Sequence, residues 1–296
     1  MADMKDGKFT HDATTPPAAK SVFELFSLKG RTAIVTGASA GNIGLAVAQA
    51  LAEAGANVAI WYNRRKEPAE AAAAEIERQY GVKCKAYQVN VTSYDAVVAA
   101  VDAIVREFNG RLDVFVANSG IAWTGGPMLD GPIDMYSDVI KTNVDGTYFC
   151  ARAAGLHFRR QKKEGTTFGD NPQPLNPPFS SGSFIATASM SGHIVNVPQL
   201  QASYNASKAA VIHLCQSLAV EWAGFARANS VSPGYIVTSI SEFLDTETKT
   251  IWKDKVPMGR EGEVHELKGA YLYLASDASS YTTGTDIKVD GGYCAP

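Results

Sequence analysis

Cysteine is scarce in this sequence and is never closely spaced. The four cysteines, Cys84, Cys150, Cys215 and Cys294, stand far apart among 296 residues. No pair has the C-x-x-C spacing of a zinc site or of a thioredoxin-like redox motif. We therefore expect reduced thiols, no metal site and a cytoplasmic protein.

The sequence also lacks an excess of charge of either sign and any long apolar run. Its 27 basic and 30 acidic residues give a net charge of −3, which provides no electrostatic basis for binding nucleic acid. No apolar run approaches the roughly 20 residues of a membrane-spanning helix. The polar segment 1–22 lacks the apolar core of a secretory signal and is expected to form a flexible lead. We expect neither a nucleic-acid partner nor a membrane association.

Short apolar runs alternate with helical patterns along the rest of the chain. Buried parallel strands are apolar throughout, and strict alternation implies right-handed crossovers between them. The pattern predicts an α/β fold over 23–296, a single-domain Rossmann-type doubly wound parallel sheet flanked by helices. Strands are expected at 31–36, 56–62, 83–89, 112–118, 183–189, 226–232 and 286–292, and helices at 43–55, 68–80, 93–108, 134–158, 203–224 and 263–276.

One connection is longer than the others. Residues 162–181 contain four prolines and separate an expected helix from an expected strand. Connections within compact α/β domains are usually much shorter than this. We therefore expect 162–181 to be a Pro-rich surface insertion.

A glycine-rich turn, TGASAGNIG at 36–44, lies between the first expected strand and the first helix. Glycines let the backbone approach a pyrophosphate, and the helix N-terminus supplies free N–H groups. A lone turn of this kind is weak evidence, but its placement after the first strand favours a dinucleotide-binding site.

The second expected strand ends at Tyr62 and is followed by Asn63, Arg64, Arg65 and Lys66. An enzyme that prefers NAD usually carries an acidic residue there, which accepts a hydrogen bond from the ribose 2′-hydroxyl. Two guanidinium groups instead favour a 2′-phosphate. The sequence indicates NADP(H), although a solvated charge run is the alternative.

Tyr204 and Lys208 stand at positions i and i+4 of the helix expected at 203–224. Such residues lie on one face, and an ammonium beside a phenol is expected to lower the pKa of the tyrosine from about 10. That change would make Tyr204 a usable proton donor near neutral pH. The helix follows the strand that ends in Ser189, at the sheet edge where ligands bind.

Seven motifs occur in one order along the chain. They are TGASAGNIG at 36–44, VANSG at 116–120, KTNVDGTYF at 141–149, TASMSG at 187–192, YNASK at 204–208, SPGYIVT at 232–238 and DGG at 290–292. Together they resemble the motifs of the classical short-chain dehydrogenase/reductase family. Stretches such as VAIWYN, HIVNVPQLQASYNASKAA and PGYIVTSI are similar to a fungal and yeast group of that family, the NADPH-dependent carbonyl and sorbose reductases, which includes mannitol-2-dehydrogenase-like and xylulose-reductase-like enzymes.

The resemblance implies a role for each matching residue. Tyr204 would be the general acid in reduction, and Lys208 would hold the nicotinamide ribose. Ser189 would hydrogen-bond the substrate carbonyl, with Ser191 as a nearby competitor, and Asn143 would hold a water that links the lysine to solvent. The expected cofactor contacts are Gly37, Ser39, Asn42, Ile43, Asn63, Arg64, Arg65, Asn90, Val91, Asn118, Ser119, Gly120, Tyr204, Lys208, Pro233, Gly234, Ile236 and Thr238.

Two positions depart from the family pattern. The glycine turn runs Gly37, Gly41, Gly44, with Asn42 as an apparent insertion. Asparagine tolerates a left-handed backbone, so we expect a bulged turn that still binds phosphate. Asn90 stands where the family more often has Asp, and its amide carbonyl can also accept a hydrogen bond from the adenine amino group.

Substrate contacts are the least determined by the sequence. Trp123 is expected to line the site, and His193 either contacts the substrate or has a structural role. Residues 239–258, with Phe243 and Trp252, are a candidate substrate lid, and a surface helix is the alternative.

The expected activity is the NADPH-dependent reduction of a ketone, either a sugar ketose or another carbonyl, to a secondary alcohol. Two alternatives remain open. One is a reductase of a ketone or imine in a fungal specialised-metabolite pathway, and the other is a non-catalytic NADP-binding sensor. The family resemblance implies a homotetramer or homodimer.

Overall fold

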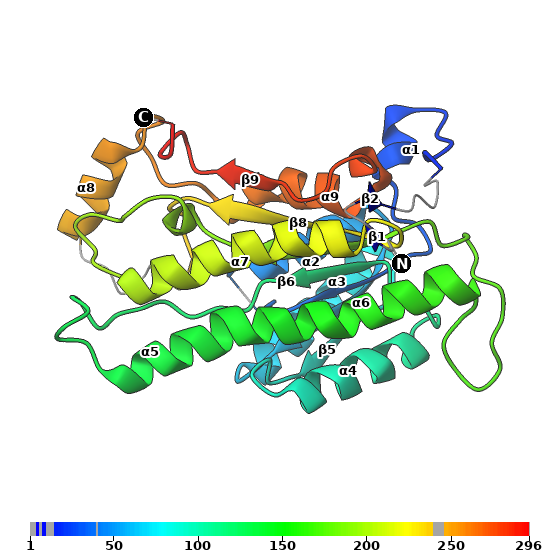
Figure 1. Ribbon diagram of the computed structural model, residues 1–296. Helices are drawn as coiled ribbons and strands as arrows, with labels where there is room; N and C mark the ends of the chain where they lie inside the picture. The colour runs from blue at the N-terminus through cyan, green and yellow to red at the C-terminus, as the bar shows by residue number, and fades with distance from the viewer. Residues whose placement is uncertain (1–3, 6–7, 10–14, 40, 239–245, 296) are drawn as a thin grey trace.

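The fold is built on a sheet of seven parallel strands (Figure 1). The computed structural model describes residues 4–5, 8–9, 15–39, 41–238 and 246–295. The strand order is β5-β4-β3-β6-β7-β8-β9, and every neighbouring pair is parallel. The strands are β3 (Thr32–Val35), β4 (Asn57–Tyr62), β5 (Cys84–Gln88), β6 (Val114–Ala117), β7 (Gly182–Thr187), β8 (Ala226–Pro233) and β9 (Asp286–Val289).

Helices cover both faces of this sheet, with α4, α6 and α7 in front of it in Figure 1 and α2 and α3 behind it. Between α5 and α6 a five-residue π-helix, η1, continues the helical rod without a break. The α-helices are α1 (Val22–Phe26), α2 (Ile43–Glu53), α3 (Lys66–Tyr80), α4 (Tyr94–Glu107), α5 (Ile133–Ile140), α6 (Gly146–Glu164), α7 (Ala202–Glu221), α8 (Thr246–Lys255) and α9 (Lys268–Ala275). The short helices are η1 (Lys141–Asp145), η2 (Met190–Gly192), η3 (Val264–Leu267) and η4 (Asp277–Ser279).

Each central strand contributes to two hydrophobic cores. Ile34, Phe115 and Phe184 pack into the core beneath α4, α6 and α7. Their neighbours along the strands, such as Val35 and Val114, pack beneath α2, α3 and α9. Because successive side chains of a strand point to opposite faces, this alternation accounts for the apolar runs. The sequence-based prediction of a doubly wound α/β fold is confirmed.

The strand order reverses between β3 and β6. The chain lays down β4 and β5 on one side of β3, then returns to place β6 to β9 on the other. Loops that leave the carboxyl ends of β3 and β6 therefore diverge and leave a crevice, which is where ligands bind in such sheets. This edge carries the residues that the sequence singled out.

Two segments differ in extent from the expectation. Helix α6 continues to Glu164, so the connection to β7 covers 165–181 and not 162–181. The lead expected over 1–22 contains two short strands, Met4–Lys5 and Lys8–Phe9, which pair antiparallel. Among the described residues, no helix combines the length and apolar character needed to cross a bilayer.

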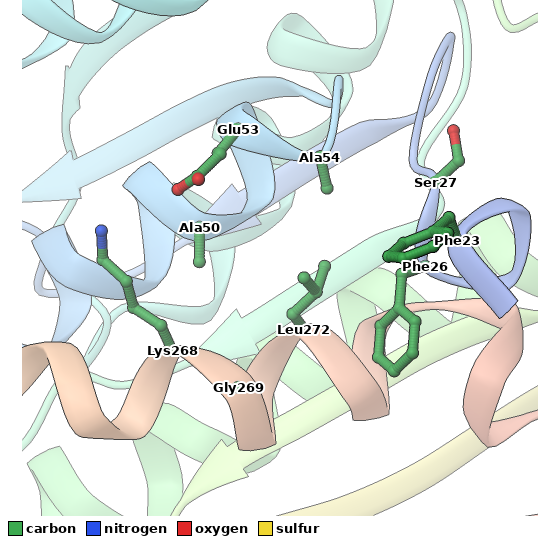
Figure 2. Close-up of a pocket in the computed structure, with 9 residues that line it drawn as sticks. All are labelled: Phe23, Phe26, Ser27, Ala50, Glu53, Ala54, Lys268, Gly269 and Leu272. Carbon is green, nitrogen blue, oxygen red and sulfur yellow. The ribbon is translucent and has the colours of Figure 1, made fainter.

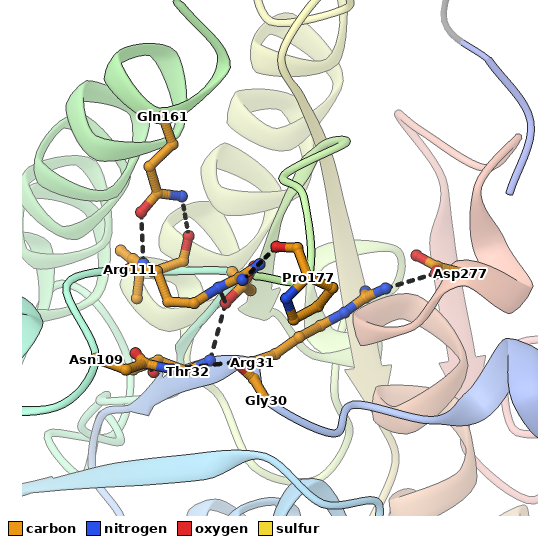
Figure 3. A network of polar contacts seen from close by, with 10 residues as sticks. Gly30, Arg31, Thr32, Asn109, Arg111, Gln161, Pro177 and Asp277 are labelled. Carbon is orange, nitrogen blue, oxygen red and sulfur yellow. Dashed lines mark hydrogen bonds and ion pairs between the residues drawn. The ribbon is translucent and has the colours of Figure 1, made fainter. Parts of the chain in front are cut away.

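The connection after α6 is fastened to the amino ends of the strands by a buried ion pair (Figure 3). The Arg111 guanidinium contacts both carboxylate oxygens of Asp113, at 2.6 and 2.8 Å, and donates to the carbonyl of Pro177 at 2.6 Å. Asp113 also accepts from the backbone N–H of Thr32 at 2.9 Å. The pair therefore joins β3, β6 and the connection 165–181.

We predict that Arg111→Ala lowers the free energy of unfolding by about 3 to 5 kcal/mol, because it leaves the Asp113 carboxylate buried without its partner. Chemical denaturation at neutral pH measures this value. Arg78→Ala, which breaks the exposed pair with Glu75, is the control and should cost less than about 1 kcal/mol. Equal effects of the two substitutions would contradict the prediction.

Candidate active site

The glycine-rich turn after β3 is closely packed against the end of β6. Gly37 and Gly41 have φ angles of +63° and +74°, a region that favours glycine. A Cβ on Gly44 would lie 2.6 Å from both the Gly37 carbonyl oxygen and the Asn118 side chain. The turn therefore requires glycine where the first turn of α2 approaches the sheet.

Asn42 does not adopt the left-handed conformation that the sequence suggested. Its backbone is extended, with φ −134° and ψ 170°, and it is the N-cap of α2. The side-chain oxygen accepts from the N–H of Leu45 at 3.0 Å, and the amide nitrogen donates to the Gly37 carbonyl at 2.9 Å. The expectation of a left-handed bulge at Asn42 is wrong, because N-capping requires an extended backbone.

Asn118, just past β6, connects three strand ends. Its amide nitrogen donates to the carbonyls of Thr36 at 3.0 Å and Gly37 at 3.3 Å. Its oxygen accepts from the hydroxyl of Thr187 at the end of β7, at 3.0 Å. The hydroxyl of Thr36 in turn accepts the backbone N–H groups of Asn118 and Ser119. The turn after β3 and the end of β7 are thus held at fixed positions.

Asn143 lies in the π-helix between α5 and α6 and is buried. Its side chain pairs with both backbone groups of Ile121, accepting from the N–H at 2.9 Å and donating to the carbonyl at 3.1 Å, and donates to the Ser207 hydroxyl at 3.1 Å. A Cβ on Gly120 would lie 3.2 Å from the Asn143 oxygen and 3.5 Å from the Lys208 ammonium. Asn143, Gly120 and Lys208 are therefore neighbours.

Ser189, Tyr204 and Lys208 are brought together at the end of β7 and the start of α7. The ammonium of Lys208 lies 5.5 Å from the centre of the Tyr204 ring and donates to the Thr187 carbonyl at 2.8 Å. Ser189 is 9% exposed, and its hydroxyl accepts from the backbone N–H of Ser191 at 3.1 Å. This arrangement places a phenol hydrogen-bonded to a serine hydroxyl, with a cation near the phenol ring.

The electrostatics of this group differ from the expectation. Desolvation raises the pKa of the Tyr204 phenol, and only its hydrogen bond with Ser189 opposes that shift. Burial lowers the pKa of the Lys208 ammonium to about 8. The pKa of Tyr204 is therefore raised and not lowered as the sequence predicted, because desolvation of the phenol is the largest effect on it.

The residues expected at the adenosine side lie beyond β4 and β5. Arg64 and Arg65 are exposed, and neither guanidinium has a hydrogen-bond or ion-pair partner in the part of the chain that the structure describes. The Asn63 carbonyl accepts from Gln88 at 2.9 Å. Asn90 is exposed and uses its side-chain oxygen to accept from Thr92, and the residue after it, Val91, is buried.

The segment after β8 is fixed against β9. The Gly234 N–H donates to the Val289 carbonyl at 2.9 Å, and a Cβ on Gly234 would lie 2.6 Å from Asp290 Cα. Pro233 is the last residue of β8, and Ile236 forms a parallel bridge with Gly262. Thr238 is partly exposed, and the lid expected at 239–258 is described only from 246 onward, so Phe243 lies outside the described residues.

The three expected substrate residues are each engaged within the protein. Trp123 is 3% exposed, and its indole N–H donates to the Gly126 carbonyl at 2.7 Å. The His193 imidazole lies 2.8 Å from a carboxylate oxygen of Asp286. Trp252 of α8 is also 3% exposed and stacks on Tyr235 with ring centres 3.7 Å apart. Its indole N–H is buried without a partner among the described residues.

Sequence reasoning missed four residues that organise this edge: Thr187, Asn196, Gln201 and Tyr235. Gln201 stands three positions before Tyr204 on the face that also carries Lys208, and that spacing was a usable signal. Thr187 and Tyr235 lie within the motifs TASMSG and SPGYIVT, but their contacts, like those of Asn196, join segments distant in sequence, which no local pattern predicts.

A cavity of about 530 Å³ lies elsewhere, between α1, the end of α2 and α9 (Figure 2). Phe23 and Phe26 of α1 lie at one end of it, Lys268 and Glu53 at the other, and Leu272 of α9 between them. None of the residues expected to bind cofactor or substrate lines it, so it is not the candidate active site.

Comparisons with known proteins agree with this geometry. A family model described as enoyl-(acyl carrier protein) reductase matches residues 37–294. The chain is 67% identical to an L-xylulose reductase of Hypocrea jecorina over 99% of this chain and all of the relative. It is 52% identical to a probable NADP-dependent mannitol dehydrogenase of Yarrowia lipolytica, over 95% of this chain and 94% of the relative.

A solved structure is similar over nearly the whole fold. The NADPH-dependent 3-quinuclidinone reductase of Rhodotorula rubra superposes with a TM-score of 0.86 at 41% identity, covering 97% of this chain and all of that chain. The seven-stranded parallel sheet, the glycine turn on its switch point and the Ser189–Tyr204–Lys208 group occur in one chain that these matches span almost completely. The chain therefore belongs to the short-chain dehydrogenase/reductase family.

Proposed function

We propose that the protein reduces a ketose to the corresponding polyol with NADPH. The observation that carries the proposal is the gathering of Ser189, Tyr204 and Lys208 at one end of the sheet. The similarity to an L-xylulose reductase and to a probable NADP-dependent mannitol dehydrogenase supports the substrate class.

The residues present fit a dinucleotide with a 2′-phosphate. Gly37 and Gly44 add no side chains of their own where the first turn of α2 meets the sheet, and a Cβ on either glycine would lie within 3.2 Å of a neighbouring atom. The guanidinium groups of Arg64 and Arg65, which have no partner among the described residues, would supply charge for the phosphate at the end of β4. NADPH supplies a hydride to the carbonyl carbon when it is bound.

In the proposed reaction the protein handles the proton and the oxygen. Ser189 donates a hydrogen bond to the substrate oxygen, which gains negative charge as the C–H bond forms. The Tyr204 phenol gives its proton to that oxygen, which completes the alcohol. The Lys208 ammonium, held on the Thr187 carbonyl at 2.8 Å, favours the phenolate that remains. Asn143 holds the backbone of Ile121 beside this group.

We also propose a cytoplasmic homodimer or homotetramer. Apolar side chains stay exposed on α5 and α6, among them Ile133 at 76% and Tyr148 at 48%, and such a patch supports contact with a second copy. All four cysteines are free thiols, which suits a reducing compartment.

Tyr204→Phe is expected to lower kcat for ketose reduction by at least about 100-fold, because it removes the proton donor. NADPH oxidation followed at 340 nm with xylulose, fructose and sorbose measures the loss. Tyr281→Phe, at a fully exposed tyrosine, is the matched control and should retain wild-type rates. A Tyr204→Phe enzyme with more than a tenth of wild-type activity would refute the assignment of the acid.

The double variant Arg64→Ala, Arg65→Ala is expected to raise the KM for NADPH about tenfold or more and to leave the KM for NADH within about twofold. Charge-assisted contacts to a phosphate are worth roughly 1.5 to 3 kcal/mol each, and 1.4 kcal/mol corresponds to tenfold. Arg78→Ala on the exposed face of α3 is the control. An equal rise in KM for NADPH and NADH would contradict the proposed contact with the 2′-phosphate.

Lys208→Met is expected to change how stability depends on pH. The lysine has a pKa near 10.4 when unfolded and about 8 in the folded protein, so between these values the unfolded chain binds more protons. The free energy of unfolding contributed by this group therefore rises with pH.

Urea unfolding at pH 8 and pH 10 checks this. The wild type should gain about 2 kcal/mol over Lys208→Met between the two pH values, by integration of the proton linkage. Lys253→Met, at an exposed position of α8, should show no such difference. A wild-type advantage that stays constant with pH would contradict the prediction.

A further inference from the structure

The side-chain amide of Gln201 is buried at the start of α7, where it meets three acceptors. Gln201 is 7% exposed and is the N-cap residue of the helix that carries Tyr204 and Lys208. Its Nε2 lies 3.1 Å from the Ser191 hydroxyl, 2.9 Å from Asn196 Oδ1 and 3.2 Å from Asn205 Oδ1. An amide nitrogen has two protons, so these acceptors hold it in one orientation.

One branch of this cluster leads to the catalytic serine. Ser191 accepts from Gln201 through its hydroxyl and donates through its backbone N–H to the hydroxyl oxygen of Ser189 at 3.1 Å. Both serines are buried, at 4% and 9% exposure. The bond from Ser191 occupies one lone pair of the Ser189 oxygen and so directs its proton toward the remaining positions, where the Tyr204 phenol lies and a substrate oxygen would bind.

The other branch leads to α8. Asn196 is 1% exposed, accepts from Gln201, and donates to the Tyr235 hydroxyl at 3.3 Å. Tyr235 stacks on Trp252 with the two rings 9° from parallel. The same loop is tied to α8 a second time, because the Lys255 ammonium donates to the Val197 carbonyl at 2.9 Å.

Removing the Gln201 donor would break the hydrogen bonds to Ser191 and to Asn196 at the same time. The loop 193–201 has no regular structure of its own after η2, so side-chain hydrogen bonds define its path. Buried acceptors that lose their donor must find another partner or remain unsatisfied at a cost. The loop would relax, and Ser191 would no longer hold Ser189 in one orientation.

We propose that Gln201 is a positioning residue for carbonyl reduction: its amide orients Ser189 through Ser191 and, through Asn196, holds the loop 193–201 against Tyr235, which stacks on Trp252. The inference rests on the proposed function, because it takes Ser189 to be the group that binds the substrate oxygen. It assigns to Gln201 an effect on the chemical step and none on the binding of NADPH.

A double-mutant cycle tests this assignment. Gln201→Met keeps the length and volume of the side chain and removes the donor. It should lower kcat for the best ketose about tenfold, since small displacements of a reacting group have effects of this order or larger, and should leave the KM for NADPH within about twofold. In a Ser189→Ala background the same substitution should change kcat less than about twofold, because the group it orients is already absent.

Gln216→Met is the matched control, with the same change at an exposed position of α7, and should leave kcat as in the wild type. A role in general stability would lower kcat by the same factor in both backgrounds, and that result would overturn the proposal. So would an unchanged kcat in the Gln201→Met enzyme. If the wild type reduces no ketose, the proposed function is wrong. If the wild type reduces a ketose but the effect of Gln201→Met on kcat is the same with and without Ser189, only the role of Gln201 is wrong.

A second variant guards against loss of folding. Gln201→Glu retains the shape of the amide and, when ionised, has no proton to donate. It should lower kcat tenfold or more in the wild-type background and less than about twofold in the Ser189→Ala background. Circular dichroism and thermal unfolding identify variants that do not fold. Unfolding of both Gln201 variants would show that the residue is a structural support and would overturn the positioning role.

Discussion

The hydrogen bonds that meet at Thr187 are the constraint on which the rest of the site depends. Thr187 is the last residue of β7. Its carbonyl accepts from the Lys208 ammonium at 2.8 Å, and its hydroxyl contacts Asn118 at 3.0 Å and the phenol of Tyr271 at 2.7 Å. Through Asn118 it reaches the glycine turn after β3. One strand end therefore fixes the distance between the catalytic helix and the turn that would bind pyrophosphate.

This constraint explains how the fold holds a buried cation and an uncharged phenol side by side. Lys208 is 4% exposed, and burial lowers the pKa of its ammonium to about 8, so the charged form is costly to the folded protein. The Thr187 carbonyl offsets part of that cost by accepting a hydrogen bond from the ammonium. The phenol of Tyr204 keeps its proton because desolvation raises its pKa. A proton donor and a nearby cation are what reduction of a carbonyl requires.

The sequence predicted a parallel sheet and singled out residues that lie at its carboxyl edge, because the alternation of apolar runs with helical patterns is a local signal. It did not predict the extended backbone of Asn42, because the sequence alone does not distinguish an asparagine that caps a helix from one inserted into a turn. It also misjudged the pKa of Tyr204, because i, i+4 spacing reports proximity and says nothing of burial. The contacts of Gln201 with Asn196, and of Asn196 with Tyr235, depend on how loops fold back on each other, which no periodic pattern encodes.

Two kinds of contact position different parts of the site: contacts to strand ends and α7, and contacts between side chains on loops. The acid and the lysine are placed by bonds to strand ends and by the rigid helix α7. The residues toward α8 are placed by side chains on irregular loops, as in the stack of Tyr235 on Trp252 and the bond from Lys255 to the loop backbone. Because loops accept substitution more readily than strands, the proposed substrate side could vary while the proposed proton donor stays fixed. In the proposed role of Gln201 the two parts join at this residue, so a change of substrate preference would be constrained by the orientation of Ser189.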